Sequence, residues 1–63
     1  MLECEAVVRD LVLRDNLCRC LKILGESPKV TGDKVFVSCQ TKNRRQVVDI
    51  FRQFGSSTIR FVD

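Results

Sequence analysis

Residues 35–51, VFVSCQTKNRRQVVDIF, contain the change from an alternating apolar run to a helical pattern, and this change decides the fold. Up to Cys39 every second residue is apolar, which is typical of a strand with one buried face. From residue 43 the apolar positions recur at intervals of three and four, which is typical of an amphipathic helix. The pattern therefore predicts a strand over residues 34–40 followed by a helix over residues 43–54.

Both ends of this helix carry recognisable signals. Asn43 is a favoured N-cap residue, and Gln46 three positions later completes a capping-box pattern. Gly55 stands where a glycine commonly ends a helix. The apolar stripe consists of Val47, Val48, Ile50, Phe51 and Phe54.

The segments around this helix indicate more strands. Residues 58–62 alternate again, so the strand, the helix and this second strand form a βαβ unit with parallel strands and a right-handed crossover. Upstream, residues 29–31 and 34–40 are expected to form a hairpin about Gly32 and Asp33, because this pair favours a tight turn.

The first third of the chain predicts one helix and leaves one segment open. Residues 13–24 fit a helix that Gly25 would stop, and Asp15 or Asn16 could cap a shorter version of this helix. The apolar residues of segment 2–9 fit either the alternation of a strand or the spacing of a helix. As a strand they give βαββαβ, a small α+β ferredoxin-like sandwich of four antiparallel strands under two helices. As a helix they give ααββαβ with a three-stranded sheet. We expect the strand, because a two-helix start leaves the sheet with little to pair.

Length and charge limit what the chain can be. Sixty-three residues form one small domain, residues 1–63, which buries only about 60% of the surface that its unfolded chain exposes. Residues 34–62 contain six bases and one acid, whereas residues 1–33 contain five bases and six acids. This asymmetry points to an anionic partner, although a merely solvated basic face would look the same. No apolar run approaches the roughly 18 residues of a membrane span, and no basic secretory signal opens the chain. We expect an intracellular, cytoplasmic protein outside the membrane.

The four cysteines are expected to be free thiols, mostly on apolar faces, because cysteine is among the most buried residue types. Cys18 is the predicted exposed thiol. It cannot share an ion with Cys20 two positions away, because the two point to different sides of a helix, and the chain has no histidine. We therefore expect no metal and no other cofactor. The remaining cysteines, Cys4, Cys20 and Cys39, fall on apolar faces.

Cys39 and Arg45 have the C-x5-R spacing of cysteine phosphatases. In that chemistry a thiolate attacks phosphorus, while the arginine and a ring of backbone N–H groups hold the oxygens. The intervening QTKNR contains none of the glycine that usually lets such a loop curl. A cysteine-based phosphoryl-transfer enzyme is therefore the least favoured function, and no catalytic residue is predicted.

Arg44 and Arg45 fall in the first helical turn, with Lys42 just ahead of it. The helix dipole makes each cation there unfavourable by about 0.3–1 kcal/mol. Two explanations stay open. Asp49 offsets Arg45 four residues away and the rest is tolerated, or an anion docks at this helix N-terminus.

The pattern also assigns the two faces of the sheet. Val35, Val37, Cys39, Ile59 and Phe61 would face the helices. Phe36, Ser38, Thr58 and Arg60 would lie on the open face. A single exposed phenylalanine offers little surface for stacking nucleobases, so we expect this face to mediate dimerisation instead.

We therefore expect a small non-enzymatic regulatory or accessory module, a homodimer that binds an anionic partner, with nucleic acid as the leading candidate. The alternative is an adaptor that docks an acidic protein. The predicted anion-binding residues are Lys34, Lys42, Arg44, Arg45, Arg52 and Arg60. The predicted dimer or stacking face contains Phe36, Ser38 and Thr58.

Overall fold

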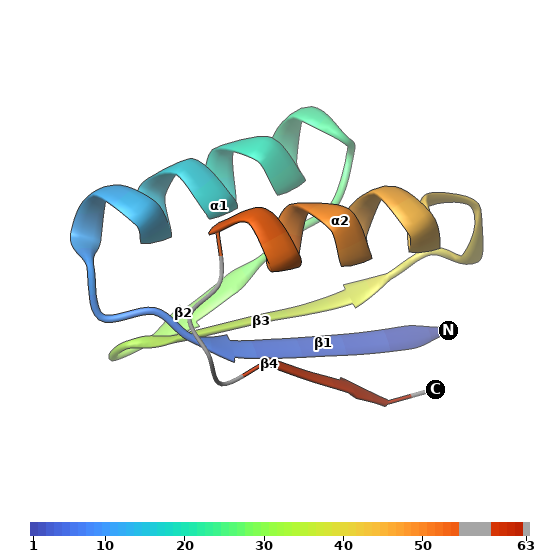
Figure 1. Cartoon of the computed structure of the whole chain (residues 1–63). Coiled ribbons are helices and arrows are strands. Elements are labelled where there is room, and N and C mark those ends of the chain that lie inside the picture. The colour runs from blue at the N-terminus through green and yellow to red at the C-terminus, as the bar shows by residue number, and fades with distance from the viewer. Residues whose placement is uncertain (55–58, 63) are drawn as a thin grey trace.

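A computed structural model describes residues 1–54 and 59–62, which form a four-stranded sheet with two helices on one face (Figure 1). The predicted α+β class and the element order βαββαβ are confirmed. The alternative with a helix over residues 2–9 is wrong, because these residues enter the sheet. In chain order the elements are β1 (Leu2–Val7), α1 (Leu11–Ile23), β2 (Lys29–Thr31), β3 (Lys34–Cys39), the 3-10 turn η1 (Thr41–Asn43), α2 (Arg44–Phe54) and β4 (Ile59–Val62).

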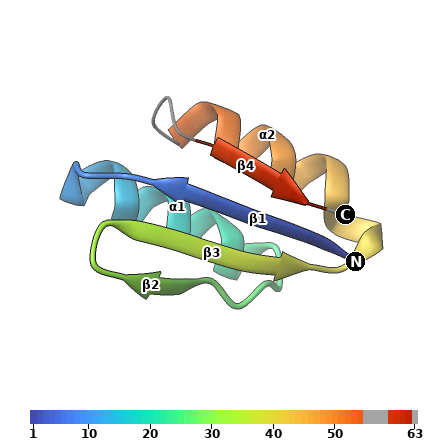
Figure 2. The same cartoon turned by 90° about the horizontal axis from the view of Figure 1, so that it is seen from below.

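The strand order is β2-β3-β1-β4, and every neighbouring pair is antiparallel (Figure 2). The first strand thus lies between β3 and β4. The two strands joined by α2 run in the same direction, as predicted, but they are not hydrogen-bonded neighbours. Strand β1 lies between the two strands of this βαβ unit, because it pairs with both β3 and β4.

Helix α1 begins two residues earlier than the sequence pattern predicted. Asp10 is its N-cap, and its Oδ1 accepts hydrogen bonds from the backbone N–H groups of Val12 at 2.8 Å and Leu13 at 3.2 Å. The predicted caps, Asp15 and Asn16, lie inside the helix instead. The prediction omitted the first turn of α1, because Leu11 and Val12 are exposed there and do not continue the buried apolar stripe.

Two glycines stand where the backbone needs positive φ. Gly25 follows α1 with φ +96°, and Gly32 lies in the turn between β2 and β3 with φ +62°. Only glycine adopts these angles without strain, so both positions predicted from the sequence are confirmed. Gly55, the predicted stop of α2, lies outside the described residues.

The core fills the space between the sheet and the helices. The predicted inward residues of β3 are buried, and Ile59 and Phe61 of β4 pack against the same core. The Phe61 ring meets that of Phe51 edge-on, with centroids 6.3 Å apart and an interplanar angle of 83°. The buried apolar side chains are Leu2, Cys4, Ala6, Val8, Leu17, Leu21, Val35, Val37, Cys39, Val47 and Phe51.

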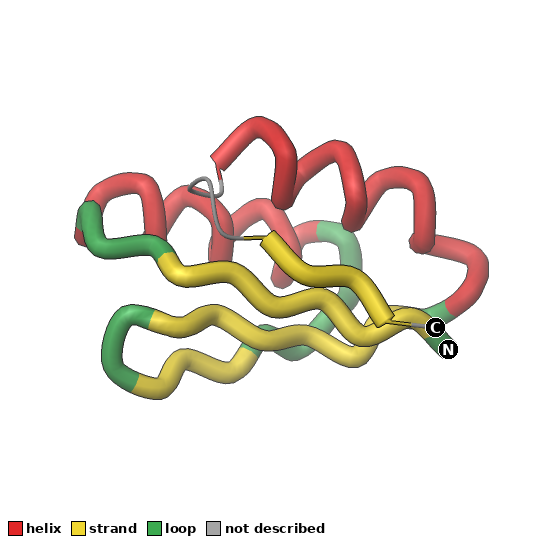
Figure 3. The backbone as a smooth tube through the Cα atoms, turned by 60° about the horizontal axis from the view of Figure 1, so that its bottom comes forward, coloured by secondary structure: helices red, strands yellow, loops and turns green. Residues whose placement is uncertain are grey.

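Figure 3 shows how the helices lie together on one side of the sheet, which leaves the other sheet face uncovered within residues 1–54 and 59–62. Neither of the described helices is long and apolar enough to cross a membrane.

Candidate polyanion-binding surface

The entry into α2 depends on a buried polar contact that the sequence pattern did not indicate. Asn43 is only 8% exposed, and its Nδ2 donates to Oε2 of Glu26 at 2.5 Å and to the backbone carbonyl of Leu24 at 3.5 Å. The same Glu26 oxygen accepts the Gln40 N–H at 3.4 Å. The predicted capping box of Asn43 with Gln46 is wrong, because Asn43 is already the last residue of η1, whose N-cap is Gln40, and its side chain contacts Glu26.

Glu26 is 6% exposed and belongs to the loop between α1 and β2. Its carboxylate ties that loop to η1, which is distant in sequence, and so fixes where α2 begins. We call the contact between Glu26 and Asn43 the latch. Sequence reasoning missed it because an acid after a helix-stopping glycine has the pattern of a solvent-exposed loop residue.

With this start fixed, the bases of η1 and α2 gather along one side of the helix. Arg45 and Arg52 are seven residues apart, which is about two helical turns, so they project from the same flank. A shallow hollow beside them is lined by Thr41, Lys42, Arg44, Arg45, Val48, Asp49 and Arg52. We call Lys42, Arg44, Arg45 and Arg52 the basic flank.

The basic flank lies on the side of α2 away from α1. Gln46, Ile50 and Gln53 line a different hollow, which α2 shares with α1. In Figure 2, α2 lies on the β4 side of the sheet and α1 on the β2 side. The flank therefore borders the β4 edge of the molecule and not its centre.

Three bases of this flank, Lys42, Arg45 and Arg52, form no ion pair with an acid among the described residues. Arg45 and Asp49 form no ion pair, although the sequence places them at i,i+4. Across the described residues, the ion pairs join Arg9 to Asp33 at 3.8 Å and Lys34 to Glu5 at 3.7 Å. Lys42, Arg45 and Arg52 are all exposed and take part in none of these pairs.

Two of the six predicted anion-binding residues lie elsewhere. Lys34 is on the open sheet face, where its Nζ meets the Glu5 carboxylate. Arg60 lies across from Glu5 on β4 and lines a hollow with Glu3, Glu5, Phe36 and Val62. The predicted set thus divides between the flank of α2 and the open face, and the structure does not bring it together in one site.

The open face holds the predicted Phe36, which is half-buried, and Ser38, which is exposed. The Ser38 hydroxyl donates to the sulfur of Met1 at 2.9 Å. Thr58, the third predicted residue, lies outside the described residues. Glu3 and Glu5 occupy the middle of this face on β1, so the surface carries both signs of charge.

The two ends of the C-x5-R spacing lie in different surroundings. Cys39 is fully buried close to the thiol of Cys4, whereas Arg45 projects from the exposed flank. The pKa of the Cys4 thiol is raised to about 12, chiefly by burial and also by the neighbouring Cys39, against a lowering by Arg44. The thiolate is the nucleophilic form of cysteine, and burial disfavours it at Cys4.

The other two cysteines line different hollows of α1, Cys18 with Lys22 and Cys20 with Leu24. Cys18 was predicted to be the exposed thiol, but it is half-buried like Cys20 and packs against the core. Burial raises the pKa of Cys18, and the nearby Lys22 ammonium partly offsets this. Among the described residues, no three cysteine or acidic side chains lie close enough to hold a metal ion.

Comparison with known protein families, with curated proteins and with solved structures finds no match to this chain.

Proposed function

We propose that this protein is a small non-enzymatic regulatory or accessory module that binds a polyanion, nucleic acid in the first instance, through the basic flank of α2. One observation carries the proposal. Lys42, Arg45 and Arg52 are exposed along one side of a helix and pair with no acid among residues 1–54 and 59–62. Two of these bases also sit at a helix start, where the dipole disfavours them.

The dimensions of the flank fit a phosphate backbone. Seven residues of helix separate Arg45 from Arg52, which corresponds to about 10 Å along the axis. One strand of a duplex carries a phosphate every ~3.4 Å of axis, so the flank spans about three phosphates. Three contacts give a slope of roughly −2.7 for log K against log salt concentration. Binding should then weaken about 40-fold between 50 and 200 mM salt.

The open sheet face supports the homodimer in the proposal. It combines Phe36 and Val62 with Glu5 and Arg60, so a second copy can present opposite charges to it. A polyanion would instead meet the carboxylates of β1 at the centre of this face. Sedimentation at tens of micromolar tests this part separately, and a pure monomer there would remove it from the proposal.

The test of polyanion binding uses fluorescence anisotropy with labelled single-stranded and duplex 12-mers. The variant Lys42→Glu with Arg45→Glu should lose at least tenfold in affinity and flatten the salt slope. Its fold should be kept or slightly stabilised, because acids suit a helix start. The matched control is Lys22→Glu with Lys29→Glu, which makes the same change in net charge away from the flank. Equal losses in both variants, or no binding by the parent protein at 50 mM salt, would refute the proposal.

A further inference from the structure

The basic flank belongs to a helix that is covered on two sides. Helix α2 packs against the sheet through Val47 and Phe51, which are both fully buried, and α1 lies beside it on the same sheet face (Figure 3). A helix with its side chains is about 10–12 Å wide, and the major groove of a duplex is about 12 Å wide and 8.5 Å deep. Because the sheet and α1 adjoin α2, this helix cannot enter such a groove to its full depth. Its bases can reach the phosphates at the rim of the groove more readily than the edges of the nucleobases.

The aromatic side chains, which could hold nucleobases by stacking, lie away from the basic flank. The sequence contains four phenylalanines and no tyrosine or tryptophan. Phe51 is fully buried, and Phe61 packs edge-on against it. Phe54 lines the hollow between α2 and α1, and Phe36 lies on the open face, across the sheet from the helices (Figure 1). None of these four described residues lines the hollow of the basic flank, so bases have no ring to stack on there.

Without stacking, affinity follows the density of phosphate charge, which is higher in a duplex than in a single strand. Each phosphate contact contributes about 0.9 to the salt slope for a duplex but about 0.7 for a single strand. With about three contacts, the slopes are roughly −2.7 and −2.1. If the two forms bind equally at 1 M salt, the duplex therefore binds about fourfold more tightly at 0.1 M. One stacked base would reverse this order, because it strengthens binding about 5- to 150-fold.

We propose that the basic flank binds the phosphate backbone of a nucleic-acid duplex from outside its grooves, without reading the base sequence. This inference rests on the proposed function and narrows its ligand. Lys42, Arg45 and Arg52 contact phosphates, and the Thr41 hydroxyl in the same hollow can donate to a phosphate oxygen. Asp49 also lines this hollow and is the one acid of its lining, so its carboxylate repels the backbone.

The probes are labelled 12-mers of one mixed sequence, as a single strand and as a duplex, together with an A·T-only and a G·C-only duplex. Fluorescence anisotropy of the full chain at 50–200 mM salt gives the affinity and its salt slope. At 0.1 M salt the mixed duplex should bind about fourfold more tightly per phosphate than the single strand, with the steeper slope. The three duplexes should agree within about twofold, because phosphate contacts carry no sequence information.

Replacing Asp49 by asparagine separates repulsion of the backbone from recognition of a base. The change should strengthen binding to all three duplexes about threefold, as expected for one unit charge roughly 6 Å from a phosphate in water. If the carboxylate instead accepted a hydrogen bond from cytosine, the same change would weaken binding to the G·C duplex alone.

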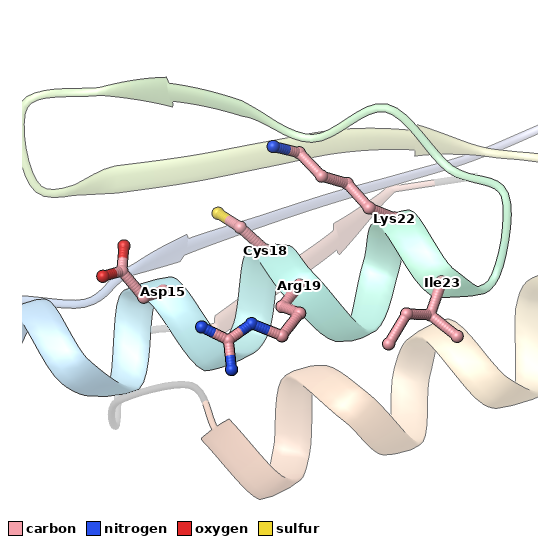
Figure 4. A pocket seen from close by; sticks show the side chains of 5 residues that line it. All are labelled: Asp15, Cys18, Arg19, Lys22 and Ile23. Carbon is pink, nitrogen blue, oxygen red and sulfur yellow. The ribbon is translucent and has the colours of Figure 1, made fainter.

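Arg52→Gln removes one phosphate contact and should lower the duplex slope by about 0.9 for every sequence. Arg19→Gln on α1 is the matched control. Figure 4 shows that Arg19 projects toward α2 and Lys22 toward the β2–β3 hairpin, so these two bases do not line one flank. Arg19→Gln should change duplex affinity by less than about twofold, because salt screens a charge on the far side of α2. Phe54→Leu, which removes a half-buried ring of α2, should change the affinity for either form by less than about twofold.

The outcomes distinguish this inference from the proposed function. Binding of neither form at 50 mM salt overturns both. Three other results overturn this inference alone: a single strand that binds at least as tightly as the duplex, a loss of binding in Phe54→Leu, or weaker binding of Asp49→Asn to the G·C duplex alone. A difference of more than about twofold between the A·T and G·C duplexes also overturns it, since base edges would then be read.

Discussion

Replacing Asn43 by alanine tests the latch between Glu26 and η1. The change removes the amide that donates to Glu26 at 2.5 Å and leaves a carboxylate that is only 6% exposed without that partner. A hydrogen bond to a charged group contributes about 1.5–3 kcal/mol to stability. We therefore expect the free energy of unfolding to fall by about 2–3 kcal/mol.

That loss is large for a chain of this size, because a small core supplies only about 3–5 kcal/mol. Urea unfolding followed by circular dichroism should show the midpoint falling by about 2 M at an m-value near 1 kcal/mol/M. The melting temperature should fall by roughly 10–20 °C, at 4–8 °C for each kcal/mol. Gln46→Ala is the control: it would be costly if the capping box existed, but it should stay within about 0.5 kcal/mol, as for an exposed side chain.

A double-mutant cycle with Glu26→Ala isolates the contact. Removing both partners leaves no buried carboxylate, so the double variant should be little worse than Asn43→Ala alone. The expected coupling between the two positions is about 1–2 kcal/mol. A coupling below about 0.5 kcal/mol, with additive losses, would refute the claim that this contact fixes the start of α2.

Two further predictions concern the thiol pair and the first helix. The Cys4 pKa is raised from 9.0 to about 12, so its stabilising effect is complete below pH 9 and is lost as the pH rises toward 12. Chemical unfolding in that window should show the free energy of unfolding falling by up to about 1.4 kcal/mol per pH unit. Cys4→Ala should make this dependence on pH less steep. An unchanged dependence would contradict the raised pKa of Cys4. Asp10→Ala removes the N-cap of α1 and should cost about 1 kcal/mol by thermal melting, whereas Asn16→Ala, at a position first predicted as the cap, should cost clearly less.

Periodicity predicted most of the fold because it depends on local physics. Inward and outward residues alternate along β3, and the stripe of α2 recurs at helical spacing, so burial could be read from the chain itself. The roles of the glycines at positions 25 and 32 could also be predicted from the sequence, because positive φ at a helix end or in a tight turn favours glycine. Contacts between residues far apart in the sequence produce no local pattern of this kind. Nothing local to Glu26 indicates that it is buried against Asn43.

The same limit explains the mixed outcome for the candidate site. Counting charges along residues 34–62 found the bases but not the acidic side chains beside Lys34 and Arg60. Lys34 is the first residue of β3 and Arg60 is the second residue of β4. Both project to the open face, where β1 supplies Glu3 and Glu5 from the other end of the chain. Only the tertiary pairing of β1 with both strands shows that these two bases have acidic neighbours.

The latch helps to decide between the two explanations for the bases at the start of α2, which are tolerance within the fold and docking of an anion. The first turn of this helix contains no acid. A buried carboxylate nevertheless lies against Asn43, the residue just before it, and so supplies negative charge where the helix dipole favours it. This accounts for how the fold tolerates bases at that position. It does not account for Arg45 and Arg52, which lie two turns apart on an exposed flank and form no ion pair within residues 1–54 and 59–62. The tolerance has a structural cause within the fold, whereas the alignment of the exposed bases is what an external anion would explain.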